Sequence, residues 1–429
     1  MTGHQKTLTP LSNEKMKAAF GAMSHPRDFR PFVPPKVPAA LNTSRRERTR
    51  EVSTPDSPIT LIHALWGELM AEPFRGVTTD GTLRPLRREL PPNGAPREAM
   101  DRAGRRILGI LRPEIASQVR FAIDAPQWRR WHNMPMQWER DGIGLEEMNE
   151  AERAATLELV RASVSEKGYR HIVELMQVNR FSGELIGREK YLNEFCYSFG
   201  LFGTPGEADW GWQLYGHHLC LSCRLVGETY VLSPTFLAAE PTVVDGGNAA
   251  GVDAFVENEQ AALVLMRNLP DDLRRLAVTL GSILNADLPE GRRHWADSLH
   301  LAGAFRDNRI IPLEGVCARD FRAEDKARLL TLLETFFLLL PPGPKAARMA
   351  EIETSVDQTW LCWMGGWDDW APFYFRIHSP VVIAEYDCHQ AVFLTNAEPA
   401  RFHVHTITRI PEGGDYGMDL AEQLKDMSR

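Results

Sequence analysis

Two histidines alternate in a short segment near the C-terminus, RFHVHTITRIPEGGDYG at 401–417. In a β-strand successive side chains point to opposite faces, so His403, His405 and Arg409 are expected to share one face. Neutral imidazole nitrogens bind zinc, iron and copper, and a guanidinium binds carboxylates and phosphates. This strand therefore presents two candidate metal ligands, with a candidate anion-binding side chain on the same face.

A second segment, WGWQLYGHHLCLS, contains His217 and His218 next to each other. If both residues belong to a strand, their side chains point to opposite faces, and only one of them easily joins a given pocket. The sequence leaves open which one that is. We therefore keep both histidines as candidate ligands.

The third segment, FYFRIHSPVVIAEYD, places Glu385 at the end of an apolar strand, where a carboxylate needs a cation or several hydrogen-bond donors. Glu385 is a candidate metal ligand or general base. Arg376 and Arg409 are candidate catalytic residues that hold an anionic substrate group. An equally weighted interpretation is that these arginines form structural salt bridges with Asp415 or Asp387.

Together, one histidine of the 217–218 pair, His403, His405 and Glu385 would form a site for a divalent metal ion. Zinc or iron fits this donor set first, with copper or manganese as alternatives. A structural role for the two alternating histidines is the competing interpretation. Leaving imidazoles buried without partners costs about 1–3 kcal/mol each, so we expect the two histidine segments to be neighbours, within roughly 8 Å.

Composition and charge restrict the class of protein. The 429 residues are 43% hydrophobic and 25% charged, which is typical of a folded, soluble protein. The net charge of −8 disfavours nucleic acid as a partner. The N-terminus has no secretory pattern, and the longest apolar run, at 329–340, contains Glu334 and is too short for a bilayer. We expect a cytoplasmic protein without a membrane segment.

Periodicity divides the chain into three parts. Residues 1–45 contain a Pro-rich segment and are expected to form an extended arm. Residues 46–200 have helical spacing, and residues 201–429 alternate as strands do, apart from a helical insertion at about 251–345. Late strands are expected at TWLCWMGG, FYFRIHSPVVIAEYD, AVFLT and RFHVHTITRI. The predicted fold class is α+β, with a helical N-terminal lobe followed by a mainly antiparallel sheet.

Four segments carry a family resemblance: RDGIGLEEMNEAERAATLELVRASVSEKGY, FGTPGEADWGWQLYGHHLCLS, PFYFRIHSPVVIAEYD and HVHTITRIPEGGDYG. In order and spacing they resemble the family known as domain of unknown function 3500, over roughly residues 95–420. The resemblance implies no activity. It does imply that the segments selected for their chemistry are also signature segments of the family, which favours one shared pocket.

The leading functional hypothesis is a metal-dependent hydrolase or lyase that acts on a small polar or anionic organic molecule. A non-haem iron or copper oxygenase or other oxidoreductase with the same His/Glu site is the first alternative. A non-catalytic small-molecule-binding protein is the second. The sequence is also compatible with a homo-oligomer.

Overall fold

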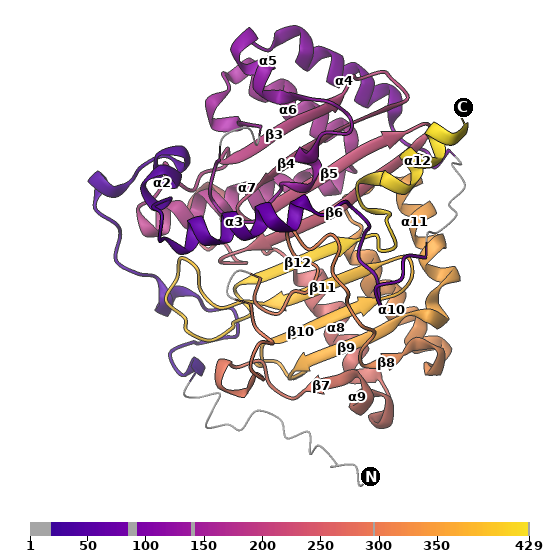
Figure 1. The fold of residues 1–429 in the computed structure, drawn as a ribbon. Coiled ribbons are helices and arrows are strands. Elements are labelled where there is room, and N and C mark those ends of the chain that lie inside the picture. Colours follow the sequence, from indigo (N-terminus) through magenta and orange to yellow (C-terminus); the bar gives the residue numbers. More distant parts are fainter. Residues whose placement is uncertain (1–18, 85–91, 139–141, 295–296, 428–429) are drawn as a thin grey trace.

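The protein is built around one twelve-stranded sheet, as a computed structural model shows (Figure 1). The structure describes residues 19–84, 92–138, 142–294 and 297–427. The strand order is β1-β3-β4-β5-β6-β12-β11-β10-β9-β7, with β2 added beside β3 and β8 beside β9. The strands are β1 (Arg120–Phe121), β2 (Ile143–Gly144), β3 (Tyr197–Gly203), β4 (Asp209–Gly216), β5 (Leu219–Val226), β6 (Thr229–Ala239), β7 (Val278–Leu280), β8 (Val316–Cys317), β9 (Trp360–Gly365), β10 (Phe373–His378), β11 (Ile383–Cys388) and β12 (Val404–Arg409).

Most neighbouring strands are antiparallel, and the parallel pairs are β1–β3 and β7–β9. The α-helices are α2 (Arg45–Val52), α3 (Pro58–Ala71), α4 (Arg97–Ile110), α5 (Pro113–Val119), α6 (Glu150–Ser163), α7 (Glu166–Ile186), α8 (Val256–Asn268), α9 (Asp271–Ala277), α10 (Ala323–Phe336), α11 (Pro342–Thr354) and α12 (Met418–Met427). The α+β fold class is confirmed.

The predicted helical lobe corresponds to α2–α7, with the short strands β1 and β2 between its helices. The expected boundary at residues 200–201 falls inside β3. The expected insertion near 251–345 contains α8, α9 and α10, with the short strands β7 and β8, and α11 begins near its end. The proposed division into domains stays a prediction. One sheet runs through both halves of the chain.

Helix starts follow local capping chemistry. Asn149 caps α6 in a reciprocal arrangement with Glu152, and the Ser165 side chain accepts a hydrogen bond from the first turn of α7. These caps satisfy backbone donors that a helix start otherwise leaves free.

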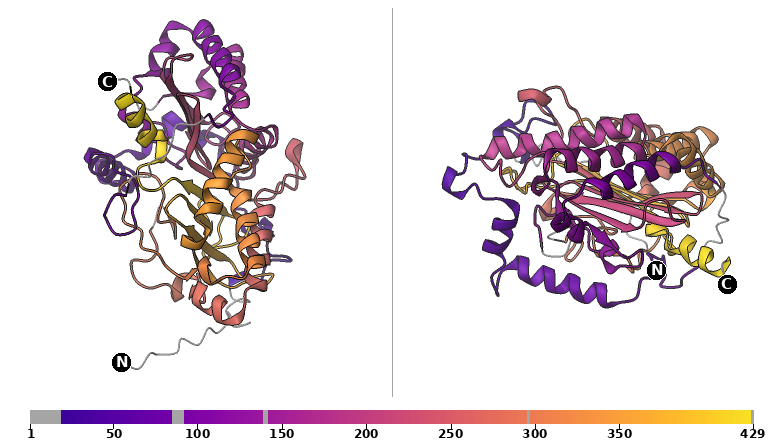
Figure 2. Two further views of the ribbon diagram at one scale, coloured as in Figure 1. Left: turned by 90° about the vertical axis from the view of Figure 1, so that its right-hand side faces the viewer. Right: turned by 90° about the horizontal axis from the view of Figure 1, so that it is seen from above.

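The two faces of the sheet differ. Long helices such as α7 and α10 cover one face, and α3 lies over the other, as the views in Figure 2 show. On the α3 face, Trp66 packs in an aromatic cluster with Trp131 and Phe236. The same face also carries His405 and Arg409, because His405 lies opposite Ala238, the residue two after Phe236 on β6.

The predicted strand AVFLT is wrong. Residues 391–395 form a loop whose consecutive backbone amides of Val392, Phe393 and Leu394 donate to the carboxylate of Glu240. A short apolar run gives the same signal for a strand and for a buried loop, so periodicity alone does not distinguish them.

Among the described helices, none has the length and apolar content needed to cross a bilayer.

Candidate metal centre

Three histidines from two distant segments meet in the interior. One ligand nitrogen from each of His218, His403 and His405 lies within 4.8 Å of the others, and all three residues are buried. The His218 ring centroid is 5.3 Å from that of His403 and 5.2 Å from that of His405. The expected proximity of the two histidine segments is confirmed.

The local structure selects His218 as the cluster member. His217 and His218 are not strand residues: they form the two-residue turn between β4 and β5, and their rings stack 3.7 Å apart. The expectation that the two rings point to opposite faces is therefore wrong. His217 instead contacts Asn179 through Nδ1 at 2.8 Å.

The turn conformation of His218 is unusual. Its φ of 69° is left-handed, which costs a residue with a side chain free energy. Tight hairpin turns usually place Asn or Gly at such positions. The backbone N–H of His218 donates to Asn133 Oδ1 at 2.8 Å, which fixes the turn. Histidine occupies this strained position, and its ring belongs to the cluster.

His405 lies on β12, and His403 lies just before that strand. The backbone N–H of His403 donates to Ala400, and its carbonyl accepts from His389 at 2.7 Å. The two imidazoles face each other, with their Nε2 atoms 2.9 Å apart. The alternation read from the sequence thus brings two nitrogens to one point.

A fourth imidazole, which the sequence reasoning missed, is that of His389. Its ring centroid lies 4.3 Å from that of His405 and 4.8 Å from that of His403. His389 Nδ1 hydrogen-bonds the carbonyl of Gln390 at 2.7 Å, while Nε2 has no hydrogen-bond partner among the described residues. The sequence could have indicated His389, because alternate residues of an extended chain share a face and residue 389 lies four after Glu385 of β11.

Burial keeps these imidazoles neutral. It lowers the pKa of His403 and of His217 to about 3. Burial, with the neighbouring histidines as a further cause, holds the pKa values of His218, His389 and His405 well below the ordinary value. Metal ligation requires the neutral form, so the ring nitrogens are ready to bind a cation at neutral pH.

Glu240 is a second residue that the sequence reasoning missed. Its carboxylate accepts the three backbone amides of the 391–395 loop, and burial nevertheless raises its pKa to about 7. One of its oxygens lies 3.7 Å from His403 Nδ1. A carboxylate behind a ligating histidine typically orients the ring.

The structure places Glu385 apart from the three histidines. Its carboxylate accepts from the Tyr374 hydroxyl at 2.5 Å and from the backbone amides of Leu301 and Ala302 at 2.9 and 2.8 Å. Burial opposes its charge, but His300 and these donors hold its pKa below the usual range. The register places Asp387, and not Glu385, opposite His405.

The two candidate arginines also lie in internal contacts. The Arg409 guanidinium is fully buried and contacts Asp307 and Asp415, each at 2.8 Å, so it does not stand at an open rim. Arg376 donates to Glu314 at 2.6 Å and to the Pro312 carbonyl at 3.0 Å. Both arginines therefore have the salt bridges of the structural interpretation, although the partner of Arg376 differs from the expected aspartates.

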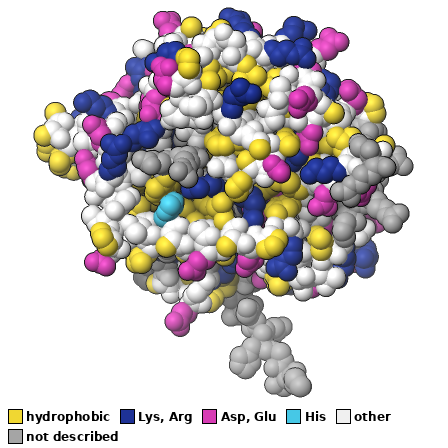
Figure 3. Space-filling model, turned by 45° about the horizontal axis from the view of Figure 1, so that its top comes forward, with side chains coloured by type: hydrophobic (Ala, Val, Ile, Leu, Met, Phe, Trp, Pro, Cys, Tyr) yellow, Lys and Arg dark blue, Asp and Glu magenta, His cyan; other side chains and the backbone are white. Residues whose placement is uncertain are grey.

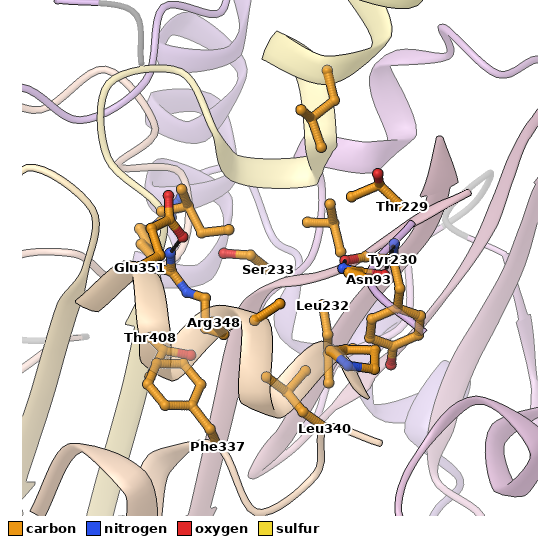
Figure 4. Close-up of a pocket in the computed structure, with 16 residues that line it drawn as sticks. Asn93, Thr229, Tyr230, Leu232, Ser233, Phe337, Leu340, Arg348, Glu351 and Thr408 are labelled. Carbon is orange, nitrogen blue, oxygen red and sulfur yellow. Dashed lines mark hydrogen bonds and ion pairs between the residues drawn. The ribbon is translucent and has the colours of Figure 1, made fainter. Parts of the chain in front are cut away.

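A cavity of about 240 Å³ lies between the start of β6, α11 and α12 (Figure 4). Arg409 is among its lining residues, but its guanidinium is occupied by the contacts above. Arg348 at the same cavity contacts Glu351 and the Val381 carbonyl. None of the clustered histidines lines this cavity, so it is separate from the candidate metal centre.

The histidine cluster, Glu240 and the β11–β12 pair all belong to the part of the chain that a family model covers. Neither the curated proteins nor the solved structures yield a match. The model described as "Protein of unknown function (DUF3500)" matches residues 93–418, about three quarters of the sequence. The chain therefore belongs to the DUF3500 family.

Proposed function

We propose that this protein is a metal-dependent hydrolase or lyase whose divalent ion, zinc first, is held by His218, His403 and His405. The observation that carries the proposal is the convergence of three neutral, buried ring nitrogens within 4.8 Å. Burying imidazoles without partners costs about 1–3 kcal/mol each, and a shared cation would offset this cost.

The donor geometry supports the fit. Two nitrogens bound to one tetrahedral zinc at about 2.0–2.1 Å lie about 3.3 Å apart, close to the 2.9 Å between the Nε2 atoms of His403 and His405. Nε2 of His218 has no hydrogen-bond partner within the described part of the chain. His389, with its own unpartnered Nε2, is the nearest candidate for a fourth ligand.

The donor types favour zinc or copper. All three clustered ligands are nitrogens, and Glu385 is engaged with Tyr374 and backbone amides. An iron(II) oxygenase site usually has two histidines and a carboxylate. A bound zinc would supply a Lewis acid and a water of lowered pKa for hydrolysis or lysis.

Residues next to the candidate ligands fix their positions. Glu240 lies beside His403 Nδ1 and is fixed by backbone amides, and Asn133 fixes the turn that carries His218. Glu240 thus lies behind the His403 ring, whereas Asn133 holds the backbone that carries the His218 ring. Rings fixed in this way bind a metal with little loss of side-chain freedom.

Arginines near the cluster support an anionic or polar substrate. Burial lowers the pKa of Arg309, and the nearby Arg306 lowers it further, while Glu385 and Asp297 oppose the shift. Arg292 lies over the Tyr374 ring at 5.2 Å. The His300 ring connects this region to the cluster, 6.1 Å from the ring of His405. Guanidinium groups placed this way would attract a carboxylate or phosphate group.

The test is metal analysis of untagged protein, with His405→Ala and the control His378→Ala. Both histidines are buried and lie on neighbouring parts of one sheet, but His378 is outside the cluster. We expect about one zinc per wild-type and His378→Ala chain, and little in His405→Ala. Equal metal content in all three proteins, or none in the wild type, would refute the proposal. Bound iron or copper would favour the redox alternative.

Activity is measured on the same samples with 4-nitrophenyl acetate and 4-nitrophenyl phosphate as generic probes of hydrolysis. Turnover by the zinc-loaded protein should disappear with a chelator and return with zinc. Metal binding without turnover of these probes would favour a lyase over a hydrolase. Lyase activity is then tested by following carbon–oxygen or carbon–carbon bond cleavage in small hydroxy acids.

A further inference from the structure

The clustered histidines are closed off from solvent, so an ion reaches them only if a part of the protein moves. His403 is 0% exposed and His218 is 2% exposed. On the face of the molecule drawn in Figure 3, little of the surface is histidine. The strands β6, β11 and β12 have hydrogen-bonded neighbours on both sides, and central strands open only at a high cost in free energy. The moving part is therefore expected among the loops.

One loop leaves the histidine cluster and returns to it. It runs from His389 to His403, whose rings lie 4.8 Å apart. At its base the His389 N–H donates to the His403 carbonyl at 2.7 Å, and the Ala400 N–H donates to the His389 carbonyl at 3.1 Å. Loops that are closed at the base but unpaired along their length open more easily than sheet strands. Opening this loop would move His403, a candidate ligand, together with His389.

The N-terminal arm fastens this loop at two points. Both the backbone N–H and the hydroxyl of Thr395 donate to the Phe32 carbonyl, at 2.9 and 3.0 Å. The Phe32 ring packs on the ring of Phe402, the residue before His403, with centroids 5.5 Å apart. The arm therefore holds the loop near its middle and again at its base.

The arm is itself fixed to the body of the protein on both sides of Phe32. On one side Arg30 Nε donates to Asp245 at 2.6 Å. On the other side the Val37 N–H donates to the Ile186 carbonyl at the end of α7, at 2.8 Å. The family model begins at residue 93, so the matched domain does not supply these contacts itself. Residues 27–37, called the strap below, thus form a segment held at both ends that crosses the loop.

The loop also holds residues that lie behind the candidate ligands. The backbone amides of Val392 and Phe393 donate to Glu240, which lies 3.7 Å from His403 Nδ1. The Phe393 ring meets the His217 ring edge-on at 5.2 Å, and the His217 ring stacks on that of His218. A displacement of the loop would therefore disturb the surroundings of His403 and of His218.

We propose that the strap keeps the 389–403 loop closed over the histidine cluster and thereby sets the rate at which a metal ion enters and leaves. This inference rests on the proposed metal site and adds a means of retaining the ion. The strap contacts the loop and none of the three candidate ligands directly among the interactions described above. Loosening it should therefore change the rate of metal exchange while the number of bound ions stays the same.

Phe32→Ala loosens the strap, and Phe121→Ala is its matched control. Phe32 is a partly buried ring that packs on the buried ring of Phe402. Phe121 is likewise partly buried and packs on the buried ring of Phe202, with centroids 5.1 Å apart. Phe121 belongs to β1, at the edge of the sheet away from β12. The two substitutions remove similar contacts, so a difference between the variants reports the position of the ring and not its loss alone.

The experiment follows the transfer of zinc from each full-length protein to an excess of the chelator 4-(2-pyridylazo)resorcinol. All three proteins should start with about one zinc per chain. Wild type and Phe121→Ala should release zinc at similar rates, and Phe32→Ala should release it at least about tenfold faster. Equal rates in the wild type and Phe32→Ala, or the same acceleration in both variants, would overturn the proposal.

Hydrogen exchange in metal-free protein tests whether the strap holds the loop. The backbone amides of residues 392–395 should exchange at least about tenfold faster in Phe32→Ala than in the other two proteins, while the amides of β12 exchange alike in all three. Unchanged exchange of the loop amides would overturn the proposal. A wild type that binds no zinc would refute the metal site and with it the role of the strap in metal exchange, whereas bound zinc with unchanged release would refute the strap alone.

Discussion

The strand β12 carries two polar clusters on the same face, and they differ in how well they are satisfied. At one end the Arg409 guanidinium donates to Asp307, Asp415 and the carbonyls of Ala302 and Gly303. At the other end His403 and His405 meet mainly each other, and the nearby His218 Nε2 has no partner in the described chain.

This difference separates structure from function better than residue type does. A buried charge with every donor paired is complete within the chain, so it contributes to the fold. Buried imidazoles whose nitrogens converge on one point without other partners are incomplete as a group, and a shared cation would complete them. Arg409 was a candidate substrate ligand by sequence alone, and its partners favour the structural role.

The largest expected effect is from Arg409→Met. Removing this guanidinium leaves Asp307 and Asp415 buried without their cation, which should cost about 3–5 kcal/mol of unfolding free energy. Urea unfolding followed by circular dichroism measures the loss. His405→Ala in metal-free protein should lose much less, because it removes no paired charge. Equal losses would remove the distinction between the two clusters.

Zinc should stabilise the protein only through the histidine cluster. Zinc at about 100 times its dissociation constant should add about 2.7 kcal/mol to the unfolding free energy of the wild type. The same addition should leave His405→Ala nearly unchanged, and His378→Ala should respond as the wild type does. Thermal melts with and without zinc measure the effect. A similar zinc response in His405→Ala would place the ion elsewhere.

A smaller effect is expected from Glu385→Gln, since the amide keeps the size but loses the charge. Tyr374 and two backbone amides donate to this carboxylate, so the variant should lose about 1–3 kcal/mol. Its zinc content should stay that of the wild type. If zinc is lost while stability is unchanged, Glu385 is a metal ligand, as its sequence position suggested.

The periodicity of the sequence was sufficient to predict part of the structure. It predicted the α+β class and, with the positions of the buried polar residues, the meeting of the histidine segments. The register between paired strands could not be predicted from these patterns. Residues 385, 387 and 389 share a face, but only the pairing of β11 with β12 shows that Asp387 lies opposite His405.

Turn and loop chemistry caused the other errors. A His-His turn has no common sequence signature, because tight turns normally contain glycine or asparagine. Likewise, the loop at 391–395 resembles a strand until the carboxylate of Glu240 is seen to organise its amides. In both cases a partner distant in sequence decides the local conformation, so no local pattern could indicate it.

The smallest effect expected concerns His378, which is buried on β10 outside the metal cluster. Burial, with Arg376 as a further cause, lowers its pKa to about 3, and both ring nitrogens lack partners among the described residues. In the unfolded chain the imidazole takes up a proton below about pH 6.5, whereas in the folded chain it does not until about pH 3. Stability from this residue is therefore complete above pH 6.5 and decreases as the pH falls toward 3.

Between pH 7.5 and 5.5 this one histidine should account for a loss of about 1.4 kcal/mol in unfolding free energy. His378→Ala should be less stable at pH 7.5, because the ring leaves a cavity, but its stability should decrease by about 1.4 kcal/mol less over this interval than that of the wild type. Urea titrations at the two pH values, in metal-free protein, measure the difference. Parallel pH profiles for both proteins would mean that His378 binds a proton equally in the folded and unfolded states, and that its ring nitrogens have found partners after all.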